Sequence, residues 1–282
     1  MRRDSNVRVI VVDSDFDPVQ EQELQQRFGA TTVVGDLTHD YFLQQIRLHK
    51  AKRVLLFGDS DFQAFEAATR ILNIAPRLQH KVILHCDNLR FMRSLQDTEL
   101  ARQCDIFNTY NLAARGFVAD HLIDHFQRTV AKDIVVMAGF GRFGQSVLEE
   151  LQTIAVDEIR HVAVIDIDAD RRVLVVDEQE RLAGDYTRTV FEGDISHPVV
   201  WDQLRKTVDL SYESPTIVLG TGEEQHNLRT ALWVKRKFPN TRVFARTNDI
   251  SKFALEVGNE HGIKSISITK LVEDHIPERW LT

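Results

Sequence analysis

The sequence repeats itself, and this repeat limits most strongly what the chain can fold into. Four segments around Asp13, Gly35, Arg53 and Lys81 return later in the same order, at offsets from 153 (166 − 13) to 163 (216 − 53) residues. A near-constant offset over four consecutive segments indicates a tandem duplication of one domain. The paired segments are VIVVD and VAVID, TVVGD and TVFEGD, RVLLFGDSD and TIVLGTGEE, and KVILHCDN and RVFARTND.

Both copies alternate short apolar runs with helix-forming stretches. Runs of β-branched and aliphatic residues are typical of parallel strands that are buried on both faces. The alternation predicts an α/β fold of Rossmann-like parallel sheets in two tandem copies. Strands are expected at 7–12, 32–34, 53–57, 81–85, 133–138, 161–165, 189–191, 216–219 and 242–245, and helices at 19–28, 61–71, 144–153, 198–207 and 224–238.

The second copy opens with a strand, a glycine turn and a helix between Asp133 and Thr153, and the first copy has no equivalent of them. The first copy thus lacks its opening β-α unit, which favours a sequence trimmed from a longer one. We expect a first domain at 1–126, which ends in a linking helix at 112–126, and a second domain at 132–282.

The composition is that of a globular protein, with 43% hydrophobic and 27% charged residues. A net charge of −7 disfavours a nucleic-acid partner, and no apolar run approaches the ~18 residues of a membrane helix. Cys86 and Cys104 form no CxxC pair, which favours a reducing, cytoplasmic setting. No metal site is expected, because the short clusters at 13–17 and 85–87 lack a complete ligand set.

The glycine turn Gly139-Phe-Gly141-Arg-Phe-Gly144 follows an expected strand and opens an expected helix. Gly139 would allow the tight bend, Gly141 would let the backbone approach a pyrophosphate, and Gly144 would let the helix pack close to the strand. The N-terminus of the helix then offers N–H groups and the positive end of its dipole to phosphates. The pattern predicts a nucleotide site, with a vacant Rossmann domain as the alternative.

Asp166 ends the next strand, 27 residues (166 − 139) beyond the first glycine. A carboxylate there accepts hydrogen bonds from ribose hydroxyls and repels a 2′-phosphate. The expected cofactor is therefore NAD(H), with AMP, ADP or ATP as alternatives, rather than NADP(H). Arg171 and Arg172 lie just beyond and leave NADP(H) open.

The motifs GFGRFG at 139–144, VIDID at 164–168, EGDIS at 192–196 and LGTGEEQHN at 219–227 resemble the RCK (KTN, TrkA-N) domain. The resemblance covers about 132–276 well, and it covers 7–126 as a degenerate copy without the glycine turn. Ala64 stands there in the place of Asn227. If no other segment supplies the phosphate-binding turn, no dinucleotide is expected to bind that copy in the usual Rossmann manner. In this family, such domains regulate potassium channels and transporters from the cytosolic side.

The resemblance also implies roles for single residues. Gly193 and Asp194 would lie by the adenine and its ribose, Asn227 would cap a helix or touch the ligand, and Arg246 would face the phosphates. A plain turn, a structural cap and a surface ion pair are the respective alternatives. The candidate nucleotide-binding residues are Gly139, Phe140, Gly141, Arg142, Phe143, Gly144, Asp166, Ile167, Asp168, Arg171, Gly193, Asp194, Ile195, Thr221, Gly222, Glu223, Asn227 and Arg246.

The resemblance leads us to expect a cytoplasmic ligand-sensing module, at the inner face of the cell membrane, of a potassium channel or transport system. Its partners would be an adenine nucleotide, a membrane pore or transporter subunit, and further copies of the chain. An NAD-dependent oxidoreductase and a soluble nucleotide-binding scaffold are the alternatives. No enzyme is expected, because none of the four tyrosines begins a Tyr-x-x-x-Lys pair and neither cysteine lies in a nucleophile motif.

Overall fold

The structure is a computed structural model that describes residues 8–58, 60–180, 185–211 and 214–281. It contains two compact units, which we call unit 1 (Met1–Asn108 with Pro277–Thr282) and unit 2 (Thr109–Ile276). The described strand pairs are all parallel, which confirms the expected α/β fold with Rossmann-like sheets. Val7 and Thr282, at the outer ends of an expected strand and an expected domain, lie outside the described residues.

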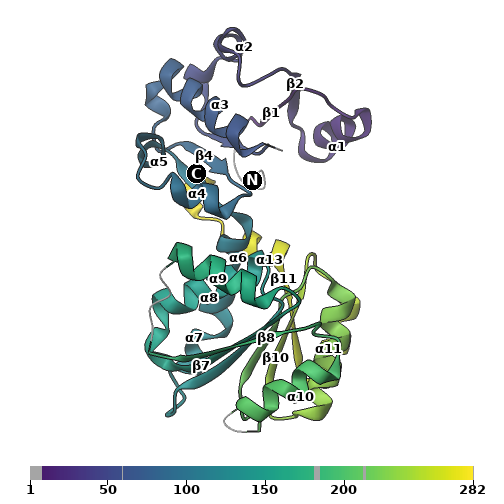
Figure 1. Cartoon of the computed structure of the whole chain (residues 1–282). Coiled ribbons are helices and arrows are strands. Elements are labelled where there is room, and N and C mark those ends of the chain that lie inside the picture. Colours follow the sequence, from purple (N-terminus) through teal and green to yellow (C-terminus); the bar gives the residue numbers. More distant parts are fainter. Residues whose placement is uncertain (1–7, 59, 181–184, 212–213, 282) are drawn as a thin grey trace. The chain divides into compact units, whose positions relative to one another are not determined.

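Unit 2 is built on a six-stranded sheet in the order β11-β10-β9-β6-β7-β8, of which Figure 1 labels β7, β8, β10 and β11. The chain therefore enters the sheet at its centre and winds outward on one side before the other, as in doubly wound folds. The strands are β6 (Asp133–Ala138), β7 (Ile159–Asp166), β8 (Thr187–Glu192), β9 (Thr216–Leu219), β10 (Arg242–Thr247) and β11 (Ile263–Ser267). The helices are α6 (Thr109–His121), α7 (Ile123–Phe126), α8 (Arg142–Ile154), α9 (Ala169–Glu180), α10 (Pro198–Thr207), α11 (Glu224–Lys237), α12 (Lys252–His261) and α13 (Ile268–His275).

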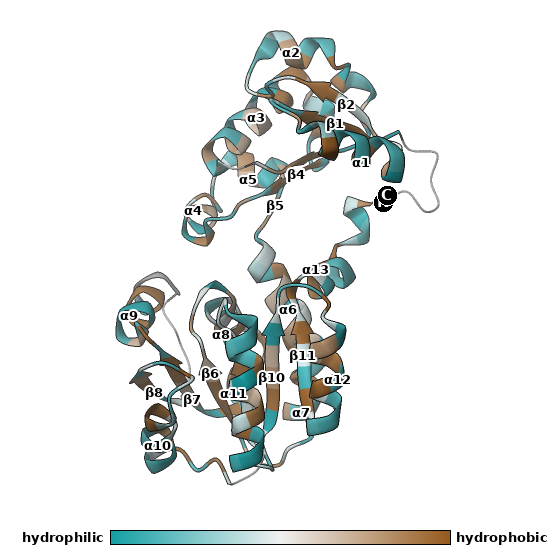
Figure 2. Ribbon diagram, turned by 90° about the vertical axis from the view of Figure 1, so that its right-hand side faces the viewer, coloured by the Kyte–Doolittle hydropathy of each residue, from teal (hydrophilic) through white to brown (hydrophobic). Residues whose placement is uncertain are grey.

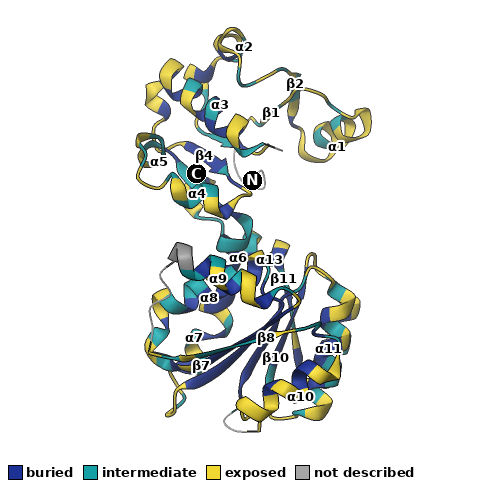
Figure 3. Cartoon of the chain, viewed as in Figure 1, coloured by how far each residue is buried: buried dark blue, intermediate teal, exposed yellow. Residues whose placement is uncertain are grey.

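Helices cover both faces of this sheet. In β6, Val135 and Met137 join an apolar cluster with α6 to α9 and α13, whereas Val136 and Ala138 join a second cluster with α10 and α11. The central strands are therefore buried on both faces (Figure 3) and apolar along most of their length (Figure 2). This double burial explains why their sequences are continuous apolar runs rather than alternating ones.

Unit 1 has the same element order as unit 2 from β7 onward, but its strands form two sheets, β1-β2 and β3-β4-β5. In unit 2, β6 lies between β7 and β9 and pairs with both. Among the described residues, unit 1 has no counterpart of β6, and its sheet is divided at that place. Ile10 of β1 is 50% exposed, whereas its counterpart Ala163 in β7 is fully buried. The missing opening β-α unit is thus confirmed.

The elements of unit 1 are short. Its strands are β1 (Ile10–Asp13), β2 (Thr31–Val34), β3 (Val54–Leu56), β4 (Val82–His85) and β5 (Asp105–Phe107). Its helices are α1 (Pro18–Phe28), α2 (Asp40–Gln45), α3 (Asp61–Ile74), α4 (Leu89–Ser94) and α5 (Glu99–Gln103). Helix α3 supplies much of the core, whereas α1 has no buried residue.

The chain exchanges segments between the units. Helices α6 and α7 follow β5 in sequence but belong to unit 2, where Phe117 and Phe126 are fully buried. Residues 277–282 belong to unit 1, where the Trp280 ring lies 4.9 Å from that of Phe107 and its Nε1–H donates to Asp105 (2.8 Å). The compact units therefore differ from the expected division at 126/132, because the apolar side of α6 completes the core of unit 2.

Histidines with lowered pKa values, among them His121 and His161, are expected to give unit 2 a pH-dependent stability. Burial, with Lys264 and Arg242 nearby, lowers the pKa of His121, and burial beside Arg160 lowers the pKa of His161. The unfolded chain, with His pKa values of about 6.5, therefore binds protons more readily than the folded one. We expect this stability to be fully present above about pH 6.5 and to be lost as the pH falls below it.

Melting temperatures at about pH 7.5 and pH 5.5 measure this loss. The double variant His121→Gln and His161→Gln should lose less stability between the two pH values than the wild-type chain does. The variant His261→Gln, at an exposed position on α12, is the matched control and should behave like the wild type. An undiminished loss in the double variant would show that other groups cause it.

Candidate functional site

The glycine turn connects β6 to α8 at the carboxyl end of the central strand. Gly139 has a φ of +94°, which L side chains rarely adopt, and a Cβ there would lie 2.7 Å from the Thr221 nitrogen. A Cβ on Gly144 would lie 2.6 Å from the Gly139 oxygen, so α8 starts in contact with the turn. At Gly141, the nearest described atom to an added Cβ is Nη1 of Arg172, at 3.5 Å. Two of the glycines thus permit close backbone packing, and Gly141 leaves room above the turn.

Helix α8 begins without a side-chain cap, because its N-cap residue is Gly141. The first N–H groups of a helix lack partners within the helix and, with the helix dipole, attract anions. The side chains of Phe140 and Phe143 are fully buried in the first apolar cluster. These two candidates therefore offer a ligand only backbone atoms.

Asp166 links the end of β7 to the glycine turn. Its Oδ2 accepts a hydrogen bond from the Phe140 N–H (2.7 Å), and its Oδ1 accepts one from the Asp168 N–H (3.1 Å). Its side chain is only 7% exposed. The carboxylate is thus held beside the turn, at the position that a ribose-binding group occupies in Rossmann domains.

Arg172 of α9, rather than the candidate Arg171, is the arginine beside the turn. Its Nη1 lies 3.1 Å from Oδ2 of Asp166. Arg171 is 80% exposed and pairs with Asp168 across 3.4 Å. Successive residues of a helix point about 100° apart, because a turn takes about 3.6 residues. The sequence shows that both arginines follow Asp166 closely. Only their positions around the helix decide that Arg172 faces Asp166 and that Arg171 faces solvent.

Arg246, at the end of β10, is a buried cation with no described carboxylate at ion-pair distance. Its Nη2 donates to Asn248 Oδ1 (2.9 Å) and its Nη1 donates to the Gly220 oxygen at 3.4 Å. Its Nε is buried without a partner in the described structure. A buried charge without a counter-ion is costly, so this guanidinium favours an anionic ligand. The alternative that Arg246 forms a surface ion pair is therefore wrong, because its side chain is buried.

Tyr110 of α6 joins two arginines beside the turn. The guanidinium carbons of Arg142 and Arg246 lie 4.7 Å and 5.2 Å from the centre of its ring, distances typical of cation–π contacts. The sequence does not identify Tyr110, because it precedes the glycine turn by 29 residues (139 − 110) and carries no motif. The exchange of α6 between the units brings it to this site.

Asn227 connects the ends of two strands. Its Oδ1 accepts hydrogen bonds from the Thr221 N–H (3.2 Å) and hydroxyl (2.7 Å), and its Nδ2 donates to the Thr221 and Arg246 oxygens, both at 3.0 Å. The side chain is fully buried. Asn227 therefore positions Thr221 and Arg246, whereas the N-cap of α11 is Glu223.

The loop after β8 lies beside the same strand ends. The Gly193 N–H donates to the Asp166 carbonyl oxygen (2.9 Å), and Asp194 Oδ1 accepts from the Ser196 N–H (2.7 Å). The hydrogen bonds from Ser196 lower the pKa of Asp194, so its carboxylate is ionised at neutral pH. Among the other candidates, Ile195 is buried in the second cluster, whereas Ile167, Gly222 and Glu223 are exposed.

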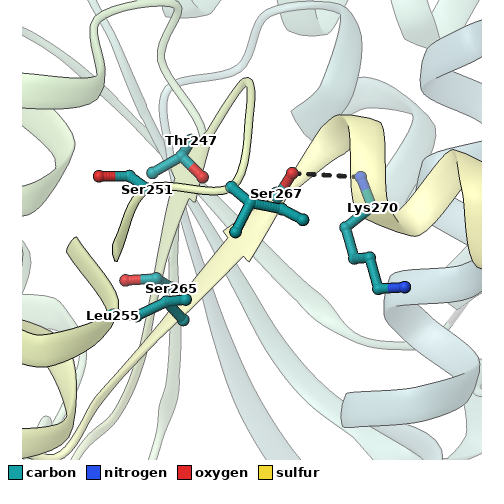
Figure 4. Close-up of a pocket in the computed structure, with 7 residues that line it drawn as sticks. Thr247, Ser251, Leu255, Ser265, Ser267 and Lys270 are labelled. Carbon is teal, nitrogen blue, oxygen red and sulfur yellow. Dashed lines mark hydrogen bonds between the residues drawn. The ribbon is translucent and has the colours of Figure 1, made fainter. Parts of the chain in front are cut away.

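A pocket of about 220 Å³ lies apart from the glycine turn, between β10, β11 and α12 (Figure 4). Two of its serine hydroxyls form hydrogen bonds with backbone groups. Ser251 caps α12 by accepting from the Ala254 N–H, and Ser267 caps α13 by accepting from the Lys270 N–H. The Lys270 ammonium pairs with Asp274 at 2.6 Å. These contacts explain the polar lining as helix capping, so we place the candidate site at the glycine turn.

Unit 2 has the fold of a Rossmann-type domain, with a glycine turn and the uncapped N-terminus of α8 at the end of its central strand. The TrkA-N domain model matches residues 1–102 and 135–268. The chain therefore belongs to the TrkA-N family, as its resemblance to RCK domains indicates. Within the described residues, no helix is long and apolar enough to cross a membrane.

Solved structures share this fold. The GsuK RCK domain has a TM-score of 0.58 and 13% identity, over 95% of this chain and 70% of that one. GsuK bound to ADP has a TM-score of 0.56 and 17% identity, over 95% of this chain and 61% of that one. The chain thus spans less than two thirds of the ADP-bound GsuK chain. A comparison with curated proteins gave no match.

The close approach at Gly144 yields a stability prediction. Gly144→Ala should destabilise unit 2 by about 1–3 kcal/mol, because the added Cβ meets a backbone oxygen in a packed region. Gly222→Ala is the control, since an added Cβ there has no atom within 4 Å, and it should change stability by less than about 0.5 kcal/mol. Urea unfolding of both variants measures the difference, and equal stabilities would show that α8 can move away from the turn freely.

Proposed function

We propose that unit 2 binds an adenine nucleotide at the glycine turn and that the chain is the ligand-sensing module of a potassium channel or transport system. NAD(H) is the first expected ligand, with AMP, ADP and ATP as alternatives. The observation that carries this proposal is the buried, uncompensated guanidinium of Arg246 beside a glycine turn and an uncapped helix. These three features provide positive charge and open N–H groups where the strand order of the sheet reverses.

The positions of these residues suggest an orientation for the ligand. The phosphates would lie over Gly141 at the start of α8, where Arg246 and Arg142 provide positive charge. A ribose hydroxyl would donate to Oδ1 of Asp166, which has one remaining acceptor position. The loops at 193–194 and 221–223 would border the ligand, and Asn227 would act by holding Thr221 and Arg246 in place.

Family membership and fold support the regulatory role. The structural relatives include one that is described as the GsuK Channel and one with bound ADP, both over more than nine tenths of this chain. In our proposal the module acts in the cytoplasm, at the inner face of the membrane, on a pore or transporter subunit. The ligand is sensed and not consumed, and it acts by binding two states of the module with different affinity.

Calorimetry on the whole chain with NADH, ADP, ATP and NADPH tests the site. We expect binding of at least one adenine nucleotide, and its loss in Gly141→Val, whose side chain would fill the room above the turn. Gly58→Val in unit 1 is the matched control, because an added Cβ there meets no atom nearer than 3.9 Å. Undiminished binding to Gly141→Val would contradict the proposed site.

Arg246→Met separates a binding role from a structural one. The substitution removes the positive charge, and the methionine side chain leaves an apolar group beside the rings of Tyr110 and Phe143. We expect nucleotide affinity to fall by about tenfold or more, since hydrogen bonds to a charged group are lost. The melting temperature of the free protein should stay or rise, because an uncompensated buried charge is removed. A fall in stability with unchanged affinity would make Arg246 structural.

The sensing role also predicts an assembly. Most of the apolar side of α6 is buried within unit 2, but Phe62 on α3 and Phe253 on α12 are 72% and 68% exposed. Exposed aromatic side chains favour contacts between chains, and symmetric pairs are the commonest assemblies. We expect a dimer or a higher even-numbered assembly whose stability changes with nucleotide. Light scattering over a range of concentrations, with and without NADH or ADP, checks this, and a monomer indifferent to nucleotide would contradict it.

A further inference from the structure

Arg172 lies where a nucleotide has to be accommodated. Its Nη1 is 3.5 Å from the place that a Cβ on Gly141 would occupy and 3.1 Å from Oδ2 of Asp166. It therefore stands between the proposed phosphate position and the proposed ribose position. Its side chain is 34% exposed, so one side of the guanidinium has room to move.

The two carboxylate oxygens of Asp166 accept different numbers of hydrogen bonds in the described structure. Oδ2 accepts from the Phe140 N–H and from Arg172, whereas the Asp168 N–H is the one donor to Oδ1 among the described residues. A carboxylate oxygen has about two acceptor positions, so Oδ2 is full and Oδ1 has one place left. A ribose diol that donates to both oxygens can therefore do so only if Arg172 leaves Oδ2.

The charge of Arg172 needs a new partner if it leaves. Asp166 is nearly buried, and separating an ion pair without replacing either partner is costly. A ribonucleoside 5′-phosphate offers both replacements: its diol can donate to Asp166, and its phosphate can accept from Arg172 above Gly141. A nucleoside offers only the first of these.

We propose that Arg172 exchanges Asp166 for the 5′-phosphates of the ligand and thereby selects ribonucleotides over nucleosides. The inference rests on the proposed nucleotide site and adds a residue to it. In this proposal, Arg172 pairs with Asp166 as long as no nucleotide is bound. The nucleotide opens this pair and replaces it with two hydrogen-bonded contacts of its own.

The experiment compares ADP with adenosine on the whole chain. In Arg172→Gln, Oδ2 of Asp166 is free, so adenosine should bind as well as to the wild type or better. ADP should bind about tenfold or more weakly, because it loses a charge-assisted contact. The preference for ADP over adenosine should therefore narrow by at least that factor. Arg171→Gln, with the same change one residue away on the exposed side of α9, is the matched control and should keep the wild-type preference.

A conservative variant guards against a merely structural effect. Arg172→Lys keeps the charge and should retain part of the preference for ADP, while melting temperatures confirm that each variant is folded. An equal change in the affinities for ADP and adenosine in Arg172→Gln, or no change in either, overturns the role of Arg172. The proposed site then still stands if the wild type binds ADP and Gly141→Val does not. A wild-type chain that binds no adenine nucleotide overturns both.

Discussion

The pairing of β6 with a strand on each side is the constraint on which the rest of unit 2 depends. It joins β7 to β9 and requires a strand that is apolar on both faces. The direction of winding also reverses there, which is the position at which doubly wound folds commonly bind ligands. In unit 1 no strand among the described residues takes the place of β6, its strands form two sheets, and β1 is half-exposed. One strand thus joins the two halves of the sheet and leads into the glycine turn.

Sequence reasoning worked best where burial leaves little freedom. Strands at 133–138 and 216–219 match β6 and β9, because a centrally buried strand must be a continuous apolar run. It missed β5 and β11, which are edge strands; in β11 the exposed Lys264 interrupts the apolar pattern. In the site, the motif predicts the turn because glycine geometry is local. It cannot distinguish Arg172 from Arg171 or find Tyr110, since those depend on side-chain direction and on packing between distant segments.

Arg172 and Arg246 differ in whether a carboxylate neutralises their charge. Arg172 has a carboxylate partner, whereas Arg246 lies buried against aromatic rings and its Nε lacks an acceptor. An anion bound near both arginines would give Arg246 a counter-ion. If it also drew Arg172 away from Asp166, it would have to offer hydrogen-bond donors to Asp166 in return. In our proposal, an anion bound beside Arg246 would therefore gain binding free energy from this buried charge.

The exchange of segments between the units changes what the duplication means. A repeated domain is commonly a module that can be deleted, shuffled or fused elsewhere, because its core is its own. Here the first copy supplies α6 to the core of unit 2, and the last residues of the chain supply Trp280 to unit 1. Removing either copy would strip buried side chains from the survivor. We therefore expect the two copies to be inherited together. A recombination event at either boundary of the sequence repeat would remove buried side chains from one of the two cores.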